Sequence, residues 1–257
     1  MTYLTICLIS LAASCLTFFT GFGLGTILMP VFALLFPIEI AIAMTAIVHM
    51  CNNIFKLFLI GGKANKLVLK KFAPPAILFA LIGSWFLTLL TDIPIITTYV
   101  IGQRSFQVTS VKIVIGLLLV IFSGFELLPQ FRKIKFADKY LAVGGAISGF
   151  FGGLSGHQGA LRSAFLSKAI HDKEAFIATG IAVAILVDLT RIPVYAGHIT
   201  KAGLLNNWQI VLAATLTAFV GAFVGAHLIK KVTLEILQYI VGFMLVLMGL
   251  LLCVGLI

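Results

Sequence analysis

The sequence predicts an all-α polytopic membrane protein with two inverted repeats, each a glycine-broken helix pair followed by three long transmembrane helices. Composition, the length of the apolar runs and the likeness of the two halves support this fold class. Of the 257 residues, 61% are hydrophobic and 10% are charged, which is more apolar surface than a soluble core needs. Runs such as Ile210–Ile229 and Ile236–Ile257 are long enough to cross a hydrocarbon layer of about 30 Å. They are continuous rather than alternating, which excludes a β-barrel.

Ten apolar segments follow one another along the chain, and a polar stretch divides them into two sets of five. The expected segments are 3–19, 24–37, 40–61, 72–91 and 107–128, then 139–154, 160–170, 174–196, 206–229 and 235–257. The dividing stretch reads PQFRKIKFADK, from Pro129 to Lys139. We therefore predict a first membrane repeat over 1–128, a cytoplasmic linker over 129–139 and a second, inverted repeat over 140–257.

The two halves resemble each other weakly but in order. TGFGLGTILMP, from Thr20 to Pro30, matches LSGHQGALRSA, from Leu154 to Ala164, and Lys56 matches Arg191 further on. In each half the first two segments are short or broken, so this pair returns to the side that it entered. Three helices follow, so each half makes an odd number of net crossings. The second half must then be inverted relative to the first.

The distribution of basic residues favours this inversion. With both termini outside, most Lys and Arg residues fall in inside loops, as the positive-inside rule requires, whereas parallel halves would lose most of that bias. The inside set is Lys63, Lys66, Lys70, Lys71, Arg132, Lys133, Lys135, Lys139, Lys168, Lys173, Lys230 and Lys231, and the outside set is Arg104 and Lys201. Inverted repeats with broken helices are typical of secondary transporters. We expect an integral protein of a bacterial plasma (inner) membrane.

Glycines mark the predicted breaks. Gly21, Gly23 and Gly25 allow one in the first half, and Gly156 and Gly159 allow one in the second. The short helix after each break is expected to start near Gly25 or Gly159, with its free N–H groups and positive dipole end pointing into the protein. Inversion would bring these two N-termini together and form an anion site. The alternative is that the glycines only allow tight helix packing.

Charged residues inside the apolar runs are the second set of candidates, because a charge in the membrane is costly and usually functional. Asp188 lies three residues before Arg191 and is predicted to pair with it. The alternatives are that Lys56 and Arg191 extend to the membrane interface, that Arg162 lies in a cytoplasmic loop, and that the asparagines only join helices. The predicted substrate-binding residues are Thr20, Gly21, Gly23, Gly25, Asn52, Asn53, Lys56, Ser155, Gly156, His157, Gln158, Gly159, Arg162 and Arg191. The candidates for carrying protons are His49, His157 and Asp188.

Nearly the whole chain resembles the TauE/SafE family of membrane permeases, the sulfite or organosulfonate exporters. The resemblance rests on GFGLGTILMPVFALLFPIEIAIAMTAIVHMCNNIFKL in the first half and GGAISGFFGGLSGHQGALRSAFLSKAIHDKEAFIATGIAVAILVD in the second. It implies two related halves that each open on a glycine-rich motif, and a small sulfur-containing anion as substrate. The second half departs from the family pattern, because Ser155–Gly159 and Arg162 stand where members commonly carry a glycine triplet and a proline. This departure implies a distinct subgroup.

The predicted function is a secondary transporter that moves a small oxyanion, such as sulfite, a sulfonate or a related sulfur anion, by alternating access. A passive anion channel built on the same charges is an alternative. A rhomboid-like intramembrane serine protease is a third, because Gly153–Gly156 reads G-x-S-G and His227 could act as a base. It leaves the glycines of the first half unexplained, so we expect no enzyme.

Composition also limits the partners. The four cysteines show no metal-ligand spacing, so neither a metal nor a cofactor is expected. The net charge of +10 lies in short loops between spans and indicates membrane orientation rather than nucleic-acid binding. The expected partners are a small anionic substrate and the lipid bilayer, with a second copy of the chain in a homodimer as a further option.

Overall fold

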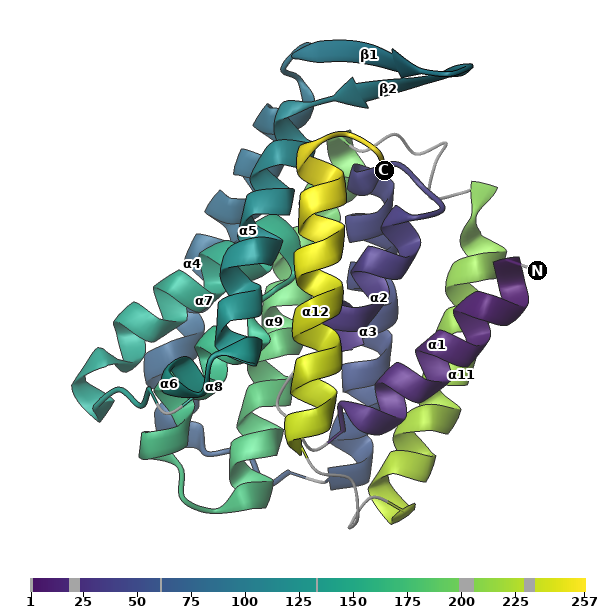
Figure 1. Cartoon of the computed structure of the whole chain (residues 1–257). Coiled ribbons are helices and arrows are strands. Elements are labelled where there is room, and N and C mark those ends of the chain that lie inside the picture. The colour runs from purple at the N-terminus through teal and green to yellow at the C-terminus, as the bar shows by residue number, and fades with distance from the viewer. Residues whose placement is uncertain (1, 19–23, 61, 133, 199–205, 229–233) are drawn as a thin grey trace.

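The computed structural model describes residues 2–18, 24–60, 62–132, 134–198, 206–228 and 234–257 (Figure 1). In this part of the chain, helices dominate. The first half holds α1 (Thr2–Leu16), α2 (Leu24–Ala33), α3 (Ile38–Ile60), α4 (Lys66–Thr91), β1 (Thr97–Ile101), β2 (Arg104–Val108) and α5 (Ser110–Leu127). After α6 (Pro129–Arg132) and η1 (Asp138–Tyr140), the second half holds α7 (Leu141–Ser155), α8 (Gly159–Ala169), α9 (Lys173–His198), α11 (Trp208–Leu228) and α12 (Leu234–Cys253). Among the described helices, α3, α4, α5, α9 and α11 are long and apolar enough to cross a membrane, which confirms a mostly helical membrane protein.

Helix α4 begins earlier than the sequence suggested. The expected segment started at residue 72, whereas the helix starts at Lys66, so the loop expected between segments 40–61 and 72–91 is wrong from Lys66 on. Asn65 explains the start, because its side chain caps the helix by accepting from the backbone N–H groups of Leu67 and Val68, each at 3.1 Å.

The junction between α3 and α4 contacts α9 through a hydrogen bond and an ion pair. The backbone N–H of Asn65 donates to the Thr179 hydroxyl at 2.8 Å. The exposed Lys63 ammonium donates to the Glu174 carboxylate, and this contact raises the pKa of Lys63. Glu174 stands in the first turn of α9, where a negative charge also favours the helix dipole.

A β-hairpin corrects the all-α expectation. Strands β1 and β2 pair antiparallel with Tyr99 opposite Phe106, and Gly102 in the turn has a φ of +62° that favours glycine. The hairpin lies at the same end of the molecule as the C-terminus (Figure 1), where the Tyr99 hydroxyl donates to the Val254 carbonyl at 2.6 Å.

Small residues let helices from the two halves pack closely. Gly145, Gly149 and Gly153 on α7 face α4, where a Cβ on each would lie 2.1–2.2 Å from a backbone carbonyl oxygen. Gly221 and Gly225 on α11 face the carbonyls of α1 in the same way. Helix α1 therefore packs on α11, and α7 packs on α4. Helices α3 and α9 pack together, as do α5 and α12.

The predicted break in the second half is confirmed. Helix α7 ends at Ser155, and the capping residue Gly156 has a φ of +82° and donates its N–H to the Gly152 carbonyl at 3.0 Å. Helix α8 starts at Gly159. In the first half, α2 starts at Leu24, next to the expected Gly25. Thr20, Gly21 and Gly23 lie outside the described residues.

Candidate anion site

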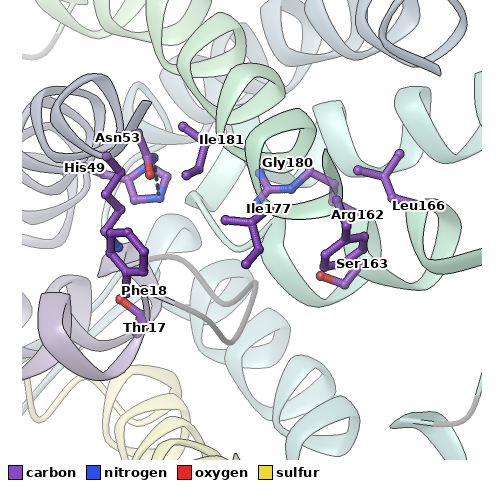
Figure 2. A pocket seen from close by; sticks show the side chains of 12 residues that line it. Thr17, Phe18, His49, Asn53, Arg162, Ser163, Leu166, Ile177, Gly180 and Ile181 are labelled. Atoms are coloured by element: carbon purple, nitrogen blue, oxygen red, sulfur yellow. Dashed lines mark hydrogen bonds between the residues drawn. The ribbon is translucent and has the colours of Figure 1, made fainter. Parts of the chain in front are cut away.

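A cavity of about 30 Å³ lies between the end of α1 and helices α3, α8 and α9. Its lining residues are Thr17, Phe18, His49, Asn53, Lys56, Arg162, Ser163, Leu166, Phe176, Ile177, Gly180 and Ile181. Figure 2 shows His49 and Asn53 on one side and Arg162 reaching from α8 toward α9 on the other. None of the described lining residues is acidic.

Two cations from different halves of the chain meet at this cavity. Lys56 on α3 is 3% exposed and Arg162 on α8 is 5% exposed. The Lys56 ammonium lies 5.5 Å from the centroid of the Phe18 ring. The Arg162 Nε packs against Gly180 on α9, at an ordinary contact distance of 3.4 Å from the place of a Cβ there. Neither cation extends to an exposed interface, and Arg162 lies within a helix, which contradicts the loop alternative.

A buried ionic cluster adjoins the cavity through His49. Asp188 accepts at Oδ2 from His49 Nδ1 at 2.7 Å, and at Oδ1 from Arg191 Nε at 2.8 Å and Nη2 at 2.7 Å. Asp188 is 0% exposed and Arg191 1% exposed. The predicted Asp188–Arg191 pair is confirmed. Arg191 does not line the cavity, which distinguishes it from Lys56 and Arg162.

The glycine break packs against this cluster. A Cβ on Gly156 would lie 2.8 Å from Arg191 Nη1, so both the left-handed backbone and the close approach require glycine there. Arg191 Nη1 has no hydrogen-bond partner among the described residues. One turn further along α9, the buried Tyr195 hydroxyl donates to the Gly153 carbonyl. These contacts hold α9 against the end of α7.

A smaller cavity of about 10 Å³ lies at the starts of α2 and α8. Its lining residues are Thr26, Phe122, Glu126, His157, Gly159, Ala160 and Leu245. The N-terminal turns of the two short helices therefore meet at one cavity, as the sequence predicted. His157 Nδ1 lies 3.1 Å from the Ser155 carbonyl, while its Nε2 is buried with no partner in the described part of the chain.

The structure separates the predicted site residues instead of gathering them around one space. His49, Asn53, Lys56 and Arg162 line the larger cavity, whereas His157 and Gly159 line the smaller one. The arrangement expected from the sequence, with Arg162 beside the N–H groups of its own helix start, is not the one observed. An arginine one turn into a helix projects sideways from it, whereas the first N–H groups point along its axis.

The other predicted residues lie between helices. Asn52 Oδ1 accepts from the Ser14 hydroxyl at 3.0 Å and joins α3 to α1. Gly25 packs on the His49 ring, since a Cβ there would lie 3.7 Å from it. Gln158 is 1% exposed, and its amide has no hydrogen-bond partner among the described residues.

The geometry of Ser155 and His227 argues against a protease dyad. The buried Ser155 hydroxyl donates to the Phe151 carbonyl at 3.1 Å. His227 Nδ1 lies 2.8 Å from the Phe223 carbonyl on the exposed end of α11. Each group thus has its own main-chain partner. Within the described ranges, no group of three or more His, Cys, Asp or Glu residues is placed to hold a metal ion.

Sequence reasoning did not select several residues at these cavities. Glu126 is 2% exposed at the smaller cavity, and as the only acid in the apolar run IGLLLVIFSGFELL it carried a usable signal. Tyr195 carried a weaker one. Thr17, Phe18 and Gly180 had none, because only the packing of three helices brings them to Arg162 and Lys56.

Membrane-length helices pack around a buried cavity that Lys56 and Arg162 line, and they define an integral membrane protein. The chain belongs to the sulfite exporter TauE/SafE family, whose family model matches residues 6–252. It is a membrane transporter of that family rather than a member of an enzyme family. Comparison with curated proteins and with solved structures gives no match.

Proposed function

We propose that this chain is a secondary transporter that carries a small oxyanion, such as sulfite, a sulfonate or a related sulfur anion, by alternating access. The observation that carries the proposal is the convergence of buried Lys56 and Arg162 on one cavity with no acidic residue in its described lining. The protein would lie in a bacterial plasma membrane with both termini outside, as a monomer or a homodimer.

The two cations suit an oxyanion. Each charge costs roughly 2.5–3.5 kcal/mol to place at the membrane centre on insertion scales, and an arriving anion offsets that cost. The planar guanidinium of Arg162 can donate to two oxygens of a sulfite or sulfonate group, whereas Lys56 supplies a compact charge. Asn53 and Ser163 add neutral polar groups to the same wall.

The helix pairing supports the inverted-repeat part of the proposal. Helix α1 of the first half packs on α11 of the second, and α7 of the second half packs on α4 of the first. In addition, α3 packs on α9 and α5 packs on α12. Two similar units related by a two-fold axis produce this pattern. If that axis lies in the membrane plane, the halves have opposite orientations, and movement of one against the other would open the cavity alternately to each side.

A panel of anions tests substrate binding directly. The detergent-purified protein is heated with sulfite, methanesulfonate, sulfate, phosphate or chloride, and its melting temperature is measured. A ligand that binds only the folded state raises this temperature by mass action. We expect sulfite or methanesulfonate to give the largest rise. If neither raises it above chloride at the same ionic strength, the proposed substrate class is wrong.

Transport by a carrier is distinguished from a passive channel in liposomes. Vesicles loaded with unlabelled sulfite should accumulate labelled sulfite transiently, and this counterflow should saturate with concentration. A channel gives no counterflow. The matched control is Lys168→Gln, which removes an exposed cation from the same helix as Arg162 and should leave counterflow unchanged.

A further inference from the structure

His49 belongs both to the cavity and to the buried ionic cluster. Its ring lines the cavity with Lys56 and Arg162, and its Nδ1 lies 2.7 Å from the Asp188 carboxylate. The ring is 2% exposed, and the Asn53 Nδ2 atom lies 3.1 Å from Nε2 and 3.3 Å from Nδ1. His49 therefore lies between the proposed anion cavity and the buried Asp188 carboxylate.

The hydrogen bonds around His49 accommodate two protonation states. The Asp188 carboxylate accepts from both Arg191 and His49 Nδ1, so Nδ1 carries a proton in the neutral ring as in the protonated one. The Asn53 amide nitrogen is almost equally close to both ring nitrogens, so it does not lie along the Nε2 lone pair. A second proton on Nε2 therefore keeps the bond to Asp188 and displaces no in-line hydrogen bond to Asn53.

We propose that His49 binds a proton that is transported together with the anion. This inference rests on the proposed function. Asp188 and Arg191 offset each other, so a protonated His49 adds a further positive charge beside Lys56 and Arg162. In a buried site this is unfavourable when the cavity is empty and favourable when an anion fills it. Anion and proton therefore increase each other's affinity, as thermodynamic linkage requires, and travel in the same direction.

Titratable groups lie near His49 on four helices. The titratable groups near it are Cys51 and Lys56 on α3, Cys15 on α1, Arg162 on α8, and Asp188, Arg191 and Tyr195 on α9. Helix α2 carries none, and Lys112, Glu126 and His227 on α5 and α11 stand near helix ends. Of these, Asp188 alone makes an ionic contact with the ring.

The pH dependence of methanesulfonate binding tests the proposal. This probe keeps one charge between pH 5 and 8, whereas sulfite itself titrates. In the wild type, the dissociation constant of methanesulfonate should rise about tenfold per pH unit above the pH at which His49 is half protonated. This slope is expected because one proton is linked to binding. Calorimetry in two buffers of different ionisation enthalpy should report uptake of about one proton. His49→Gln should lose most of this pH dependence and most of the proton uptake, and the exposed control His227→Gln should behave as the wild type.

A second variant keeps the test decisive if His49→Gln does not fold. Asn53→Asp places a carboxylate beside the His49 ring, which favours its protonated form. The pH midpoint of methanesulfonate binding should therefore move to higher pH, even if overall affinity falls. An unchanged midpoint would exclude His49 as the titrating group, as would a His49→Gln protein that keeps the wild-type pH dependence. In both cases the anion still binds, and the proposed function stands. A wild type that binds neither sulfite nor methanesulfonate would overturn both.

Discussion

At the scale of single residues, Arg162 is the side chain on which the proposed anion site most depends. It is buried, it belongs to the half opposite Lys56, and it reaches the cavity past Gly180. A guanidinium differs from an ammonium at this position because its donors form a rigid fork that matches two oxygens of one anion. Substitutions that separate charge from geometry therefore test its role.

Arg162→Lys should weaken anion binding although the net charge is unchanged, and Arg162→Gln should nearly abolish it. Loss of a charge-assisted hydrogen bond costs roughly 1.5–3 kcal/mol, or about a ten- to hundred-fold change in affinity. Thermal-shift titration with sulfite measures this change, and Lys168→Gln is the control. Affinity within two-fold of the wild type in Arg162→Gln would remove Arg162 from the site.

Asp188 makes a different prediction because its loss affects two partners. Asp188→Asn should lower expression or melting temperature more than the double change Asp188→Asn, Arg191→Gln. Breaking a buried pair leaves one charge uncompensated, at a cost of roughly 3–5 kcal/mol, whereas removing both charges is often nearly neutral. Fluorescence size-exclusion of the three proteins provides the comparison. Equal stability of all three would mean that the charges are hydrated separately.

At the scale of secondary structure, the contact between α4 and α7 depends on residues that lack a side chain. A Cβ at Gly149 would lie 2.1 Å from the Ala76 carbonyl oxygen, and backbone cannot give way as a flexible side chain can. Gly83 on α4 makes the same kind of contact with the Phe150 carbonyl of α7, so both helices contribute glycines to this close approach. Packing here also fixes the end of α7, from which the Gly156 turn leads into α8.

Gly149→Ala should therefore lower the melting temperature in detergent. Overpacking should reduce the free energy of unfolding by about 1–3 kcal/mol. Alanine is the better helix former, so the same change at an open helical position should be neutral or stabilising. Gly197 in α9 is such a position, since a Cβ there meets nothing within 4 Å. A melting temperature for Gly149→Ala equal to that of Gly197→Ala would show that α4 and α7 separate at little cost.

At the scale of the whole molecule, the orientation of the two halves is the feature that decides how the transporter works. Inverted halves give one site two equivalent routes, one to each side of the membrane. Lys66 and Thr200 follow the third helix of their respective halves, so they mark equivalent places. Thr200 lies outside the described residues, and its side of the membrane is a prediction from the sequence alone.

A cysteine-free variant with Lys66→Cys or Thr200→Cys tests the orientation. An impermeant thiol reagent added to intact cells should label position 200 and leave position 66 unlabelled until the membrane is opened, because we place the α3–α4 junction in the cytoplasm. Labelling of both positions from the same side would contradict inverted halves, whatever the outcome of the binding experiments.

Local properties of the chain decided much of what the sequence predicted correctly. Apolar runs locate helices because each span must satisfy its own backbone in lipid. Gly156 locates the break because a left-handed residue ends a helix. Asp188 and Arg191 pair because residues three apart share one helical face. The same local reasoning missed the hairpin after α4, and it placed the start of α4 too late because the side-chain cap of Asn65 was not recognised.

Only the tertiary structure decided how these parts meet. It brings Lys56 to Arg162, joins His49 to Asp188, and places Glu126 with the α2 and α8 helix starts at a separate cavity from the cations. These contacts link helices far apart in the chain, and the direction of each side chain depends on how its helix is rotated against its neighbours. Periodicity within one helix carries no information about that rotation, so the sequence determined the membrane-spanning helices and their charges, while packing between the two halves determined which charges share a cavity.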